Sequence, residues 1–107
     1  MKNHPIQVLM TTAKKEDAER IAENLVKQRM AGCVQILGPI SSVYWWKDKI
    51  ETSQEYLCLI KTEKHLYRKL EQSIKNMHSY EMPEITAFSI HAGSKQYLRW
   101  LHNNLKQ

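Results

Sequence analysis

The sequence predicts an α+β fold in which helices cover one face of a sheet. Runs rich in apolar, β-branched and aromatic residues indicate strands at residues 6–12, 33–46, 50–61 and 84–92. Two segments with apolar residues at helical spacing separate the first strand from the second and the third strand from the fourth. A shorter amphipathic segment ends the chain. These observations predict one core between a sheet and its helices.

The first strand and the first helix are justified by their periodicities. In residues 6–12, Val8 and Met10 are expected on one face of the strand and Leu9 on the other, with both faces buried. The helix predicted over residues 14–29 repeats apolar residues at spacings of three and four: Ala18, Ile21, Ala22, Leu25 and Val26. Acidic side chains in its first turn suit the helix dipole, and Gly32 is expected to end the helix.

The two middle strands are expected to form a long hairpin. Residues 33–46 and 50–61 lack helical periodicity and are rich in strand-forming residues. The turn is expected at "KDK", residues 47–49, because Asp48 tolerates turn geometry. Gly38-Pro39 is expected to bend or bulge the first of these two strands.

The last part of the chain adds a helix, a strand and a further helix. Thr62 is a candidate N-cap for the second helix, whose apolar face holds Leu66, Leu70, Ile74 and Met77. Pro83 restricts Met82 to extended geometry and so prepares the chain for the last strand. Ser94 is the expected N-cap of the terminal helix, whose apolar side holds Tyr97, Leu98, Leu101 and Leu105.

This order, β-α-β-β-α-β followed by a helix, is that of the ferredoxin-like sandwich. Here the sandwich would have a long hairpin between its second and third strands and an extra C-terminal helix. A length of 107 residues predicts one domain, 1–107, because it is close to the usual size of a domain and no linker or repeat interrupts it.

Composition and charge exclude several classes of function. The formal net charge is +5, but the basic residues alternate with acids along the predicted helices, so a nucleic-acid partner is not expected. No apolar run approaches the ~20 residues of a membrane span. The start, "MKNHPIQVLM", does not resemble a signal peptide, so the cytoplasm is the expected location. Cys33 and Cys58 lie in apolar strand segments and are expected to be reduced thiols.

The distal half of the hairpin predicts self-association. Alternation places Val43 and Trp45 on one face and Tyr44 and Trp46 on the other, so both faces of the ribbon are apolar or aromatic. Two helices cannot cover a ribbon that extends beyond the sheet. Since an exposed apolar ribbon with free edges attracts another chain, we expect a second copy to cover it.

Four segments in order, "RMAGCVQI", "SSVYWWKDKIETSQEYLCLIKT", "HSYEMPEI" and "YLRWL", resemble the CutA family of divalent-cation tolerance proteins over most of the chain. The resemblance implies a cytoplasmic homotrimer of ferredoxin-like subunits, whose hairpins pair across subunits. It implies no enzyme reaction and no required cofactor. The chain departs from the family at the hairpin tip, where Lys47-Asp48 replaces Lys-Gly, and at His78-Ser79-Tyr80, which replaces His-Pro-Tyr.

The resemblance also implies candidate metal ligands. Copper binding in the family involves a cysteine at the end of the first strand and histidines that open the His-Pro-Tyr motif. These positions are Met10, Met77 and His78 in this chain, so a thiolate and one imidazole are replaced by thioethers. Thioethers suit Cu(I) rather than Zn(II), so the expected ligand is copper, or another divalent cation, bound weakly. The competing interpretation is that both methionines belong to the core.

A second implied site is a cleft between subunits. Lys61, Tyr80, Glu84 and Trp45 match residues of the family's motifs, and they are expected to line this cleft as a binding pocket or as an interface lock. Tyr44 and Trp46 are expected in the trimer interface. A charge pair between Lys61 and Glu84 would help to orient the cleft. A calcium site at Glu81 and Glu84 has too few local carboxylates to be expected.

Three other classes of protein share this order of elements or this architecture. An acylphosphatase would need an arginine and glycines in the loop after the first strand, and "TTAKKEDAE" contains neither. An RNA-recognition module would carry stacking aromatics in its third strand, where this chain has "QEYLCLIK". A trimeric small-molecule signalling protein of the PII type remains open, as an analogy of architecture.

Overall fold

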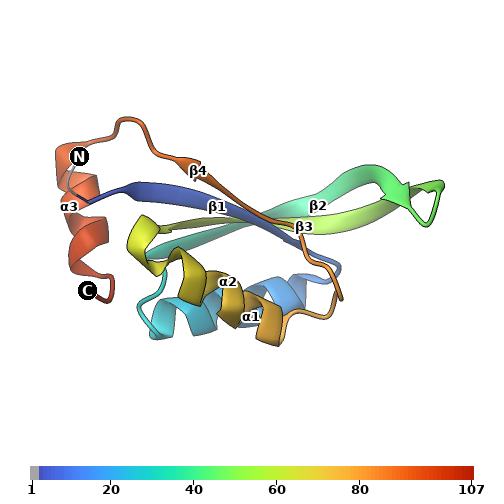
Figure 1. Ribbon diagram of the computed structural model, residues 1–107, viewed down its shortest axis with the longest axis horizontal. Coiled ribbons are helices and arrows are strands. Elements are labelled where there is room, and N and C mark those ends of the chain that lie inside the picture. Colours follow the sequence, from blue (N-terminus) through green and yellow to red (C-terminus); the bar gives the residue numbers. More distant parts are fainter. Residues whose placement is uncertain (1–2) are drawn as a thin grey trace.

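The computed structural model describes residues 3–107 as a four-stranded sheet with helices on one face, which confirms the predicted fold class (Figure 1). The elements are β1 (Pro5–Thr12), α1 (Lys15–Lys27), β2 (Cys33–Trp46), β3 (Lys49–Glu63), the short turn η1 (Lys64–Leu66), α2 (Tyr67–Met77), β4 (Ile85–Ser89) and α3 (Lys95–Asn103). The strand order is β2-β3-β1-β4, and all neighbours are antiparallel. The outer strands are therefore β2 and β4.

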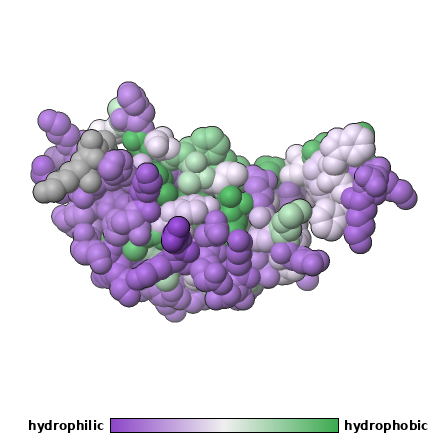
Figure 2. All heavy atoms as spheres, viewed as in Figure 1, coloured by the Kyte–Doolittle hydropathy of each residue, from purple (hydrophilic) through white to green (hydrophobic). Residues whose placement is uncertain are grey.

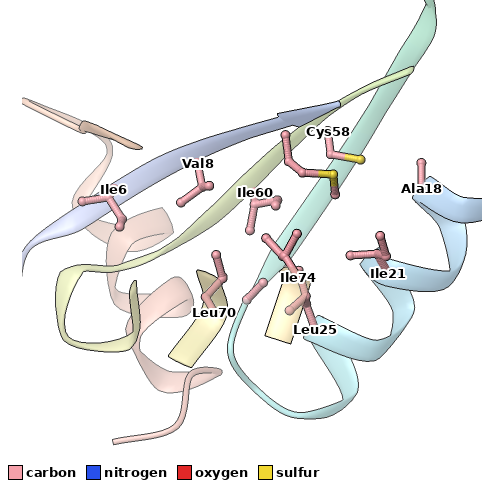
Figure 3. Packing of buried hydrophobic residues seen from close by; sticks show 11 residues of the cluster. Ile6, Val8, Ala18, Ile21, Leu25, Cys58, Ile60, Leu70 and Ile74 are labelled. Atoms are coloured by element: carbon pink, nitrogen blue, oxygen red, sulfur yellow. The ribbon is translucent and has the colours of Figure 1, made fainter. Parts of the chain in front are cut away.

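The core lies between the sheet and the pair α1 and α2 (Figure 3). Val8 and Met10 point to this side of β1 and are fully buried, as their alternation predicts. The apolar spacing of α1 is confirmed by the burial of Ala18, Ile21, Ala22 and Leu25, whereas Val26 stays 42% exposed. Burying a large aliphatic side chain contributes about 1.5–3 kcal/mol, so these contacts are the main source of stability.

The hairpin between β2 and β3 extends well beyond the helices (Figure 1). Its turn is Lys47-Asp48, and both residues have positive φ, 49° and 63°, as a two-residue turn of type I′ requires. The register shifts between Leu37 and Ile40, which confirms the predicted bulge at Gly38-Pro39. A Cβ at Gly38 would lie 2.5 Å from Cδ2 of Tyr56, so only glycine fits against that ring.

The helix α3 covers the end of the sheet with a small second core of Leu66, Leu101 and Leu105. Ser94 is its N-cap, since Oγ accepts a hydrogen bond of 3.2 Å from the backbone N–H of Tyr97, as predicted. Tyr97 is 38% exposed, so the expected apolar side of this helix is only partly buried.

Three predicted element boundaries were wrong. The helix α1 ends at Lys27 instead of the predicted residue 29, because Arg29 adopts positive φ (58°) and turns the chain before Gly32 is reached. Thr62 is not an N-cap: it lies inside β3, and its Oγ1 donates a hydrogen bond of 2.6 Å to the Met30 carbonyl. The strand β4 is limited to Ile85–Ser89, five residues, instead of residues 84–92. For α1 a backbone turn, and for Thr62 a long-range hydrogen bond, overrode the local pattern.

The second face of the sheet carries apolar side chains that no helix of the described chain covers. By register, Leu9, Leu59 and Phe88 share this face, and Leu37 and Leu57 extend it. Phe88 is 57% exposed and Leu37 46%. The hairpin adds Val43, Trp45 and Ile50, each about two-thirds exposed or more. Figure 2 shows green patches in the upper middle of an otherwise mostly hydrophilic body, and an arm of mainly pale residues that ends in a purple tip.

Candidate functional site

His78 stands at the end of α2, and both nitrogens of its ring are engaged. The Nδ1 atom lies 3.0 Å from the backbone nitrogen of Tyr80, and Nε2 lies 2.7 Å from the Thr11 carbonyl oxygen. Because a backbone N–H can only donate, Nδ1 accepts and Nε2 carries the proton that it donates to Thr11. His78 therefore ties the link after α2 to the end of β1 as a neutral imidazole.

Tyr80 extends this arrangement to β3. Its ring centroid lies 4.8 Å from that of His78, and its hydroxyl donates a hydrogen bond of 2.8 Å to Oε2 of Glu55. Burial raises the pKa of Tyr80, and the hydrogen bond to the Glu55 carboxylate raises it further. The phenol thus stays protonated and remains a donor over the physiological range.

Glu55 is the residue of this site that sequence reasoning missed. It is only 6% exposed, and it lies opposite Ile40, directly past the bulge in β2. In the sequence it looks like one polar residue among several in the hairpin. The available signal was Gly38-Pro39, because a bulge bends its strand and locally disrupts the pairing, which marks the neighbouring positions as irregular.

The candidate metal ligands lie in one region, but they are arranged as structural residues. Met10 is fully buried in β1, with Cys58 directly opposite on β3. Met77 ends α2 and packs partly against the same core. Burial raises the pKa of the Cys58 thiol to about 11, so this sulfur is protonated at neutral pH. Within residues 3–107, no group of three His, Cys, Asp or Glu side chains is placed to hold a metal ion.

The residues expected at the subunit cleft are not joined within one chain. Lys61 donates a hydrogen bond of 2.6 Å from Nζ to Oε1 of Gln35, and no ion pair links it to Glu84 in the described chain. Glu84 is exposed, and Trp45 is 72% exposed on the hairpin. Of the two expected interface residues, Tyr44 contacts Oγ of Ser53 through its hydroxyl, at 3.1 Å, and Trp46 ends β2 at the turn.

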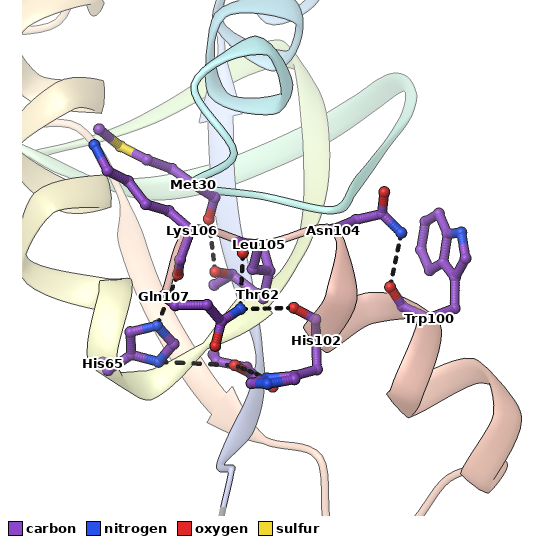
Figure 4. A network of polar contacts seen from close by, with 10 residues as sticks. Met30, Thr62, His65, Trp100, His102, Asn104, Leu105, Lys106 and Gln107 are labelled. Carbon is purple, nitrogen blue, oxygen red and sulfur yellow. Dashed lines mark hydrogen bonds and ion pairs between the residues drawn. The ribbon is translucent and has the colours of Figure 1, made fainter.

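A second polar cluster, which the sequence did not reveal, fastens the C-terminus (Figure 4). Glu63 is 2% exposed at the end of β3, and Nδ1 of His102 lies 3.0 Å and 3.1 Å from its two carboxylate oxygens. His65 lies 3.7 Å from the same carboxylate through Nδ1, and its Nε2 lies 3.0 Å from the Lys106 carbonyl oxygen. His102 thus satisfies the buried carboxylate, and His65 holds the end of the chain against the sheet through the Lys106 carbonyl.

None of the helices in the described part of the chain is long and apolar enough to cross a membrane. The fold and the site together define a small ferredoxin-like protein with a protruding hairpin and a structural histidine–tyrosine–glutamate link. A family model described as "CutA1 divalent ion tolerance protein" matches residues 6–104. The chain belongs to this family.

Relatives with known names agree with this assignment. The divalent-cation tolerance protein CutA of Thermus thermophilus is 41% identical over 91% of this chain and 94% of its own length. A chloroplastic CutA 1 of rice, Oryza sativa, is 38% identical over 95% of this chain, which spans 58% of that longer relative.

Solved structures show the same fold. The Thermus thermophilus protein superimposes with a TM-score of 0.93 at 39% identity, covering 95% of this chain and 99% of that one. A CutA from Archaeoglobus fulgidus, whose description calls it periplasmic, has a TM-score of 0.93 at 35% identity and the same coverage. The predicted resemblance and the ferredoxin-like fold are confirmed.

Proposed function

We infer that this member of the CutA family acts in divalent-cation tolerance as a cytoplasmic homotrimer. One observation carries the assembly: the hairpin of β2 and β3 leaves the body of the subunit with apolar or aromatic side chains on both faces. Trp45 is 72% exposed, Val43 67% and Ile50 65%. A monomer that leaves such a ribbon in water exposes both a large apolar patch and free strand edges.

The second face of the sheet supports the same assembly. Phe88 and Leu37 are about half exposed there, next to partly buried leucines of β1 and β3. Closed homo-oligomers are the commonest way in which soluble proteins cover such surfaces. In a trimer, each hairpin would reach a neighbouring subunit, and Lys61, Tyr80, Glu84 and Trp45 would be brought to a cleft that one chain lacks. Tyr44 and Trp46 would lie in the interface.

The assembly is tested by removing the apolar tip. Trp45→Ser combined with Val43→Ser is expected to lower the molar mass measured by light scattering, while circular dichroism stays that of a folded chain. Val26→Ser is the matched control, because Val26 is also exposed, at 42%, but lies on α1 away from the hairpin. An unchanged mass in the double variant would contradict the role of the hairpin.

For the metal, the proposal is weak copper binding at Met10, Met77 and His78. This proposal is supported by the closeness of the three residues. His78 forms a hydrogen bond to the carbonyl of Thr11, the neighbour of Met10, and Met77 directly precedes His78 in the chain. Thioethers and one imidazole form a soft donor set that suits Cu(I). Binding would be weak because His78 must give up at least one of its two hydrogen bonds, and because the neighbouring Cys58 remains a thiol.

Calorimetry with Cu(I), Cu(II) and Zn(II) tests the metal proposal. Met77→Leu removes the thioether at nearly constant volume, and it is expected to weaken Cu(I) binding, as is His78→Ala. His91→Ala, at an exposed histidine outside this region, serves as the control and should bind like the wild type. Tight Cu(I) binding that survives both substitutions would reject these ligands.

The cytoplasmic location is proposed on the basis of the free thiols. Cys33 and Cys58 form no disulfide, as expected in a reducing compartment. Relatives of this chain are described as chloroplastic and periplasmic, so the location can vary within the family. Immunoblotting of fractionated cells of the source organism tests this point: the proposal expects the protein with cytoplasmic markers, and recovery with another compartment would overturn it.

A further inference from the structure

A cavity of about 530 Å³ lies at the outer edge of the sheet, away from His78 and from the hairpin. Its walls are the start of β1, the outer strand β4, the turn η1 and the first turn of α2. The main lining residues are His4, Ile6, Lys64, His65, Arg68 and Ser89. This volume falls within the range of about 300–1,000 Å³ that is typical of sites for small organic molecules.

The charged side chains that line this cavity are basic, although two lining residues contact carboxylates behind them: His65 lies 3.7 Å from Glu63, and the Tyr67 hydroxyl bonds to Glu71. Lys64 and Arg68 contribute permanent positive charges, His4 and His65 add two imidazoles, and no acidic residue lines the cavity. Among residues 3–107, the side chains of Lys64 and Arg68 form no hydrogen bond or ion pair, although most other long basic side chains also reach into solvent. What distinguishes these two cations is that they converge on one cavity.

The first turn of the helix that begins at this cavity carries no acidic residue, although Glu63 stands directly before it as the N-cap residue of η1. The first turn of α1 carries Glu16 and Asp17, whereas the first turns of η1 and α2 carry no acid. Neither η1 nor α2 has a side-chain N-cap, and Arg68 places a cation at the positive end of the helix dipole. A cation there is unfavourable to the helix dipole, and an anion in the cavity would offset this effect.

The remaining wall is apolar and aromatic. Ile6, Tyr67, Ala87 and Phe88 line the cavity beside the basic residues, and Ser89 adds a hydroxyl at the end of β4. The register pairs Ile6 with Ser89, so both side chains lie on the face of the sheet toward α2. A ligand with a negatively charged group and a small apolar body would match a cavity that has basic residues on one side and apolar residues on the other.

We propose that this cavity binds a small organic phosphate. The phosphate would be held by Lys64 and Arg68 at the start of α2, and the organic part would lie against Ile6 and Tyr67. This site is separate from the proposed copper ligands and does not depend on metal binding. Its ligand class goes beyond cation tolerance, because the charge that the cavity attracts is negative.

The test uses phenyl phosphate as the probe, with the full-length protein observed by two-dimensional NMR of its backbone amides. Inorganic phosphate and phenol, which each carry half of the probe, are titrated in parallel. Phenyl phosphate is expected to shift the amide signals of residues 64–68 and 87–89 and to bind more tightly than either half.

Three substitutions make the result specific. Arg68→Gln and Lys64→Gln are each expected to weaken binding of phenyl phosphate by about tenfold, the usual effect of losing a charge-assisted hydrogen bond. Lys69→Gln is the matched control, because Lys69 is the exposed neighbour of Arg68 but does not line the cavity. Its affinity should stay within about twofold of the wild type.

Three outcomes would overturn the proposal. Shifts spread over the basic surface, or an equal loss of binding in Lys69→Gln, would indicate non-specific attraction of anions. Equal affinity for phosphate and phenyl phosphate would restrict the cavity to inorganic anions. Equal affinity for phenol would show that the basic residues take no part.

Discussion

At the scale of residues, the function of the "HSYEMPE" stretch depends on contacts that are distant in the sequence. Tyr80 lies 25 positions from Glu55, and His78 lies 67 positions from Thr11. The sequence drew attention to His78 and Tyr80, because polar and aromatic residues crowd there. It could not reveal Glu55 or the Thr11 carbonyl, since partners from other strands become neighbours only when the register is fixed.

Replacing Tyr80 by phenylalanine removes the hydroxyl that satisfies the buried Glu55 carboxylate. We expect Tyr80→Phe to lower the free energy of unfolding by about 1–3 kcal/mol, the cost of leaving a buried polar group without its partner. Urea denaturation measures this difference. Tyr44→Phe is the control, because the Tyr44 hydroxyl bonds to Ser53 on the exposed hairpin. An equal loss of unfolding free energy in both variants would show that the hydrogen bond to Glu55 does not cause the effect.

The Cys58 thiol is expected to make the stability of the fold depend on pH in the alkaline range. Burial raises its pKa from 9.0 to about 11, so the folded state favours the protonated thiol more than the unfolded state does. Its contribution is present below a pH of about 9 and is lost as the pH rises toward 11. We therefore expect wild-type stability to fall more steeply over this interval than that of Cys58→Val. If the free energies of unfolding of the two proteins, measured with urea, fell equally with pH between 9 and 11, this expectation would be contradicted.

His102 is expected to matter for stability although it is far from the proposed metal ligands. His102→Ala would remove the principal partner of the Glu63 carboxylate, which is 2% exposed, and we expect a loss of about 1–3 kcal/mol together with loosening of α3. Hydrogen exchange of the α3 amides measures the second effect. His91→Ala, at an exposed histidine, should change neither quantity.

At the scale of elements, most of the secondary structure followed from periodicity, and the errors have physical causes. Alternation in β1 and the helical spacing in α1 predicted the core face correctly, because burial itself imposes those periods. The end of α1 was misplaced because Arg29 adopts a positive φ that arginine rarely takes. Thr62 has the chemistry of an N-cap, yet the Met30 carbonyl recruits its hydroxyl from another segment.

The hairpin turn offers a test at this scale. Asp48 has φ of 63°, a conformation that costs L-residues about 1–2 kcal/mol and glycine very little. We expect Asp48→Gly to raise the free energy of unfolding by about 1 kcal/mol, less the entropy that glycine adds to the unfolded chain. Lys49→Gly, one residue later and inside β3, should instead destabilise the protein. Thermal unfolding tests both expectations: the melting temperature should rise in Asp48→Gly and fall in Lys49→Gly.

At the scale of the whole molecule, the single chain exposes large apolar side chains on its hairpin and on the second face of its sheet. Its principal extents are 44 × 25 × 22 Å, and the long dimension runs along the hairpin (Figure 1). The sequence predicted this protrusion, because two strands with aromatic residues on both faces are too long for two helices to cover. It could not place Lys61, Tyr80, Glu84 and Trp45 relative to one another, since the proposed cleft would depend on contacts that one chain does not contain.

The molar mass of the wild-type protein in solution tests the central claim most directly. Light scattering on a size-exclusion column, at low micromolar concentration, is expected to give three times the subunit mass of 12.7 kDa. The mass should stay constant on dilution, because the buried apolar hairpins would make the trimer tight. A stable monomer of 12.7 kDa at that concentration would contradict the proposed assembly and, with it, the cleft between subunits.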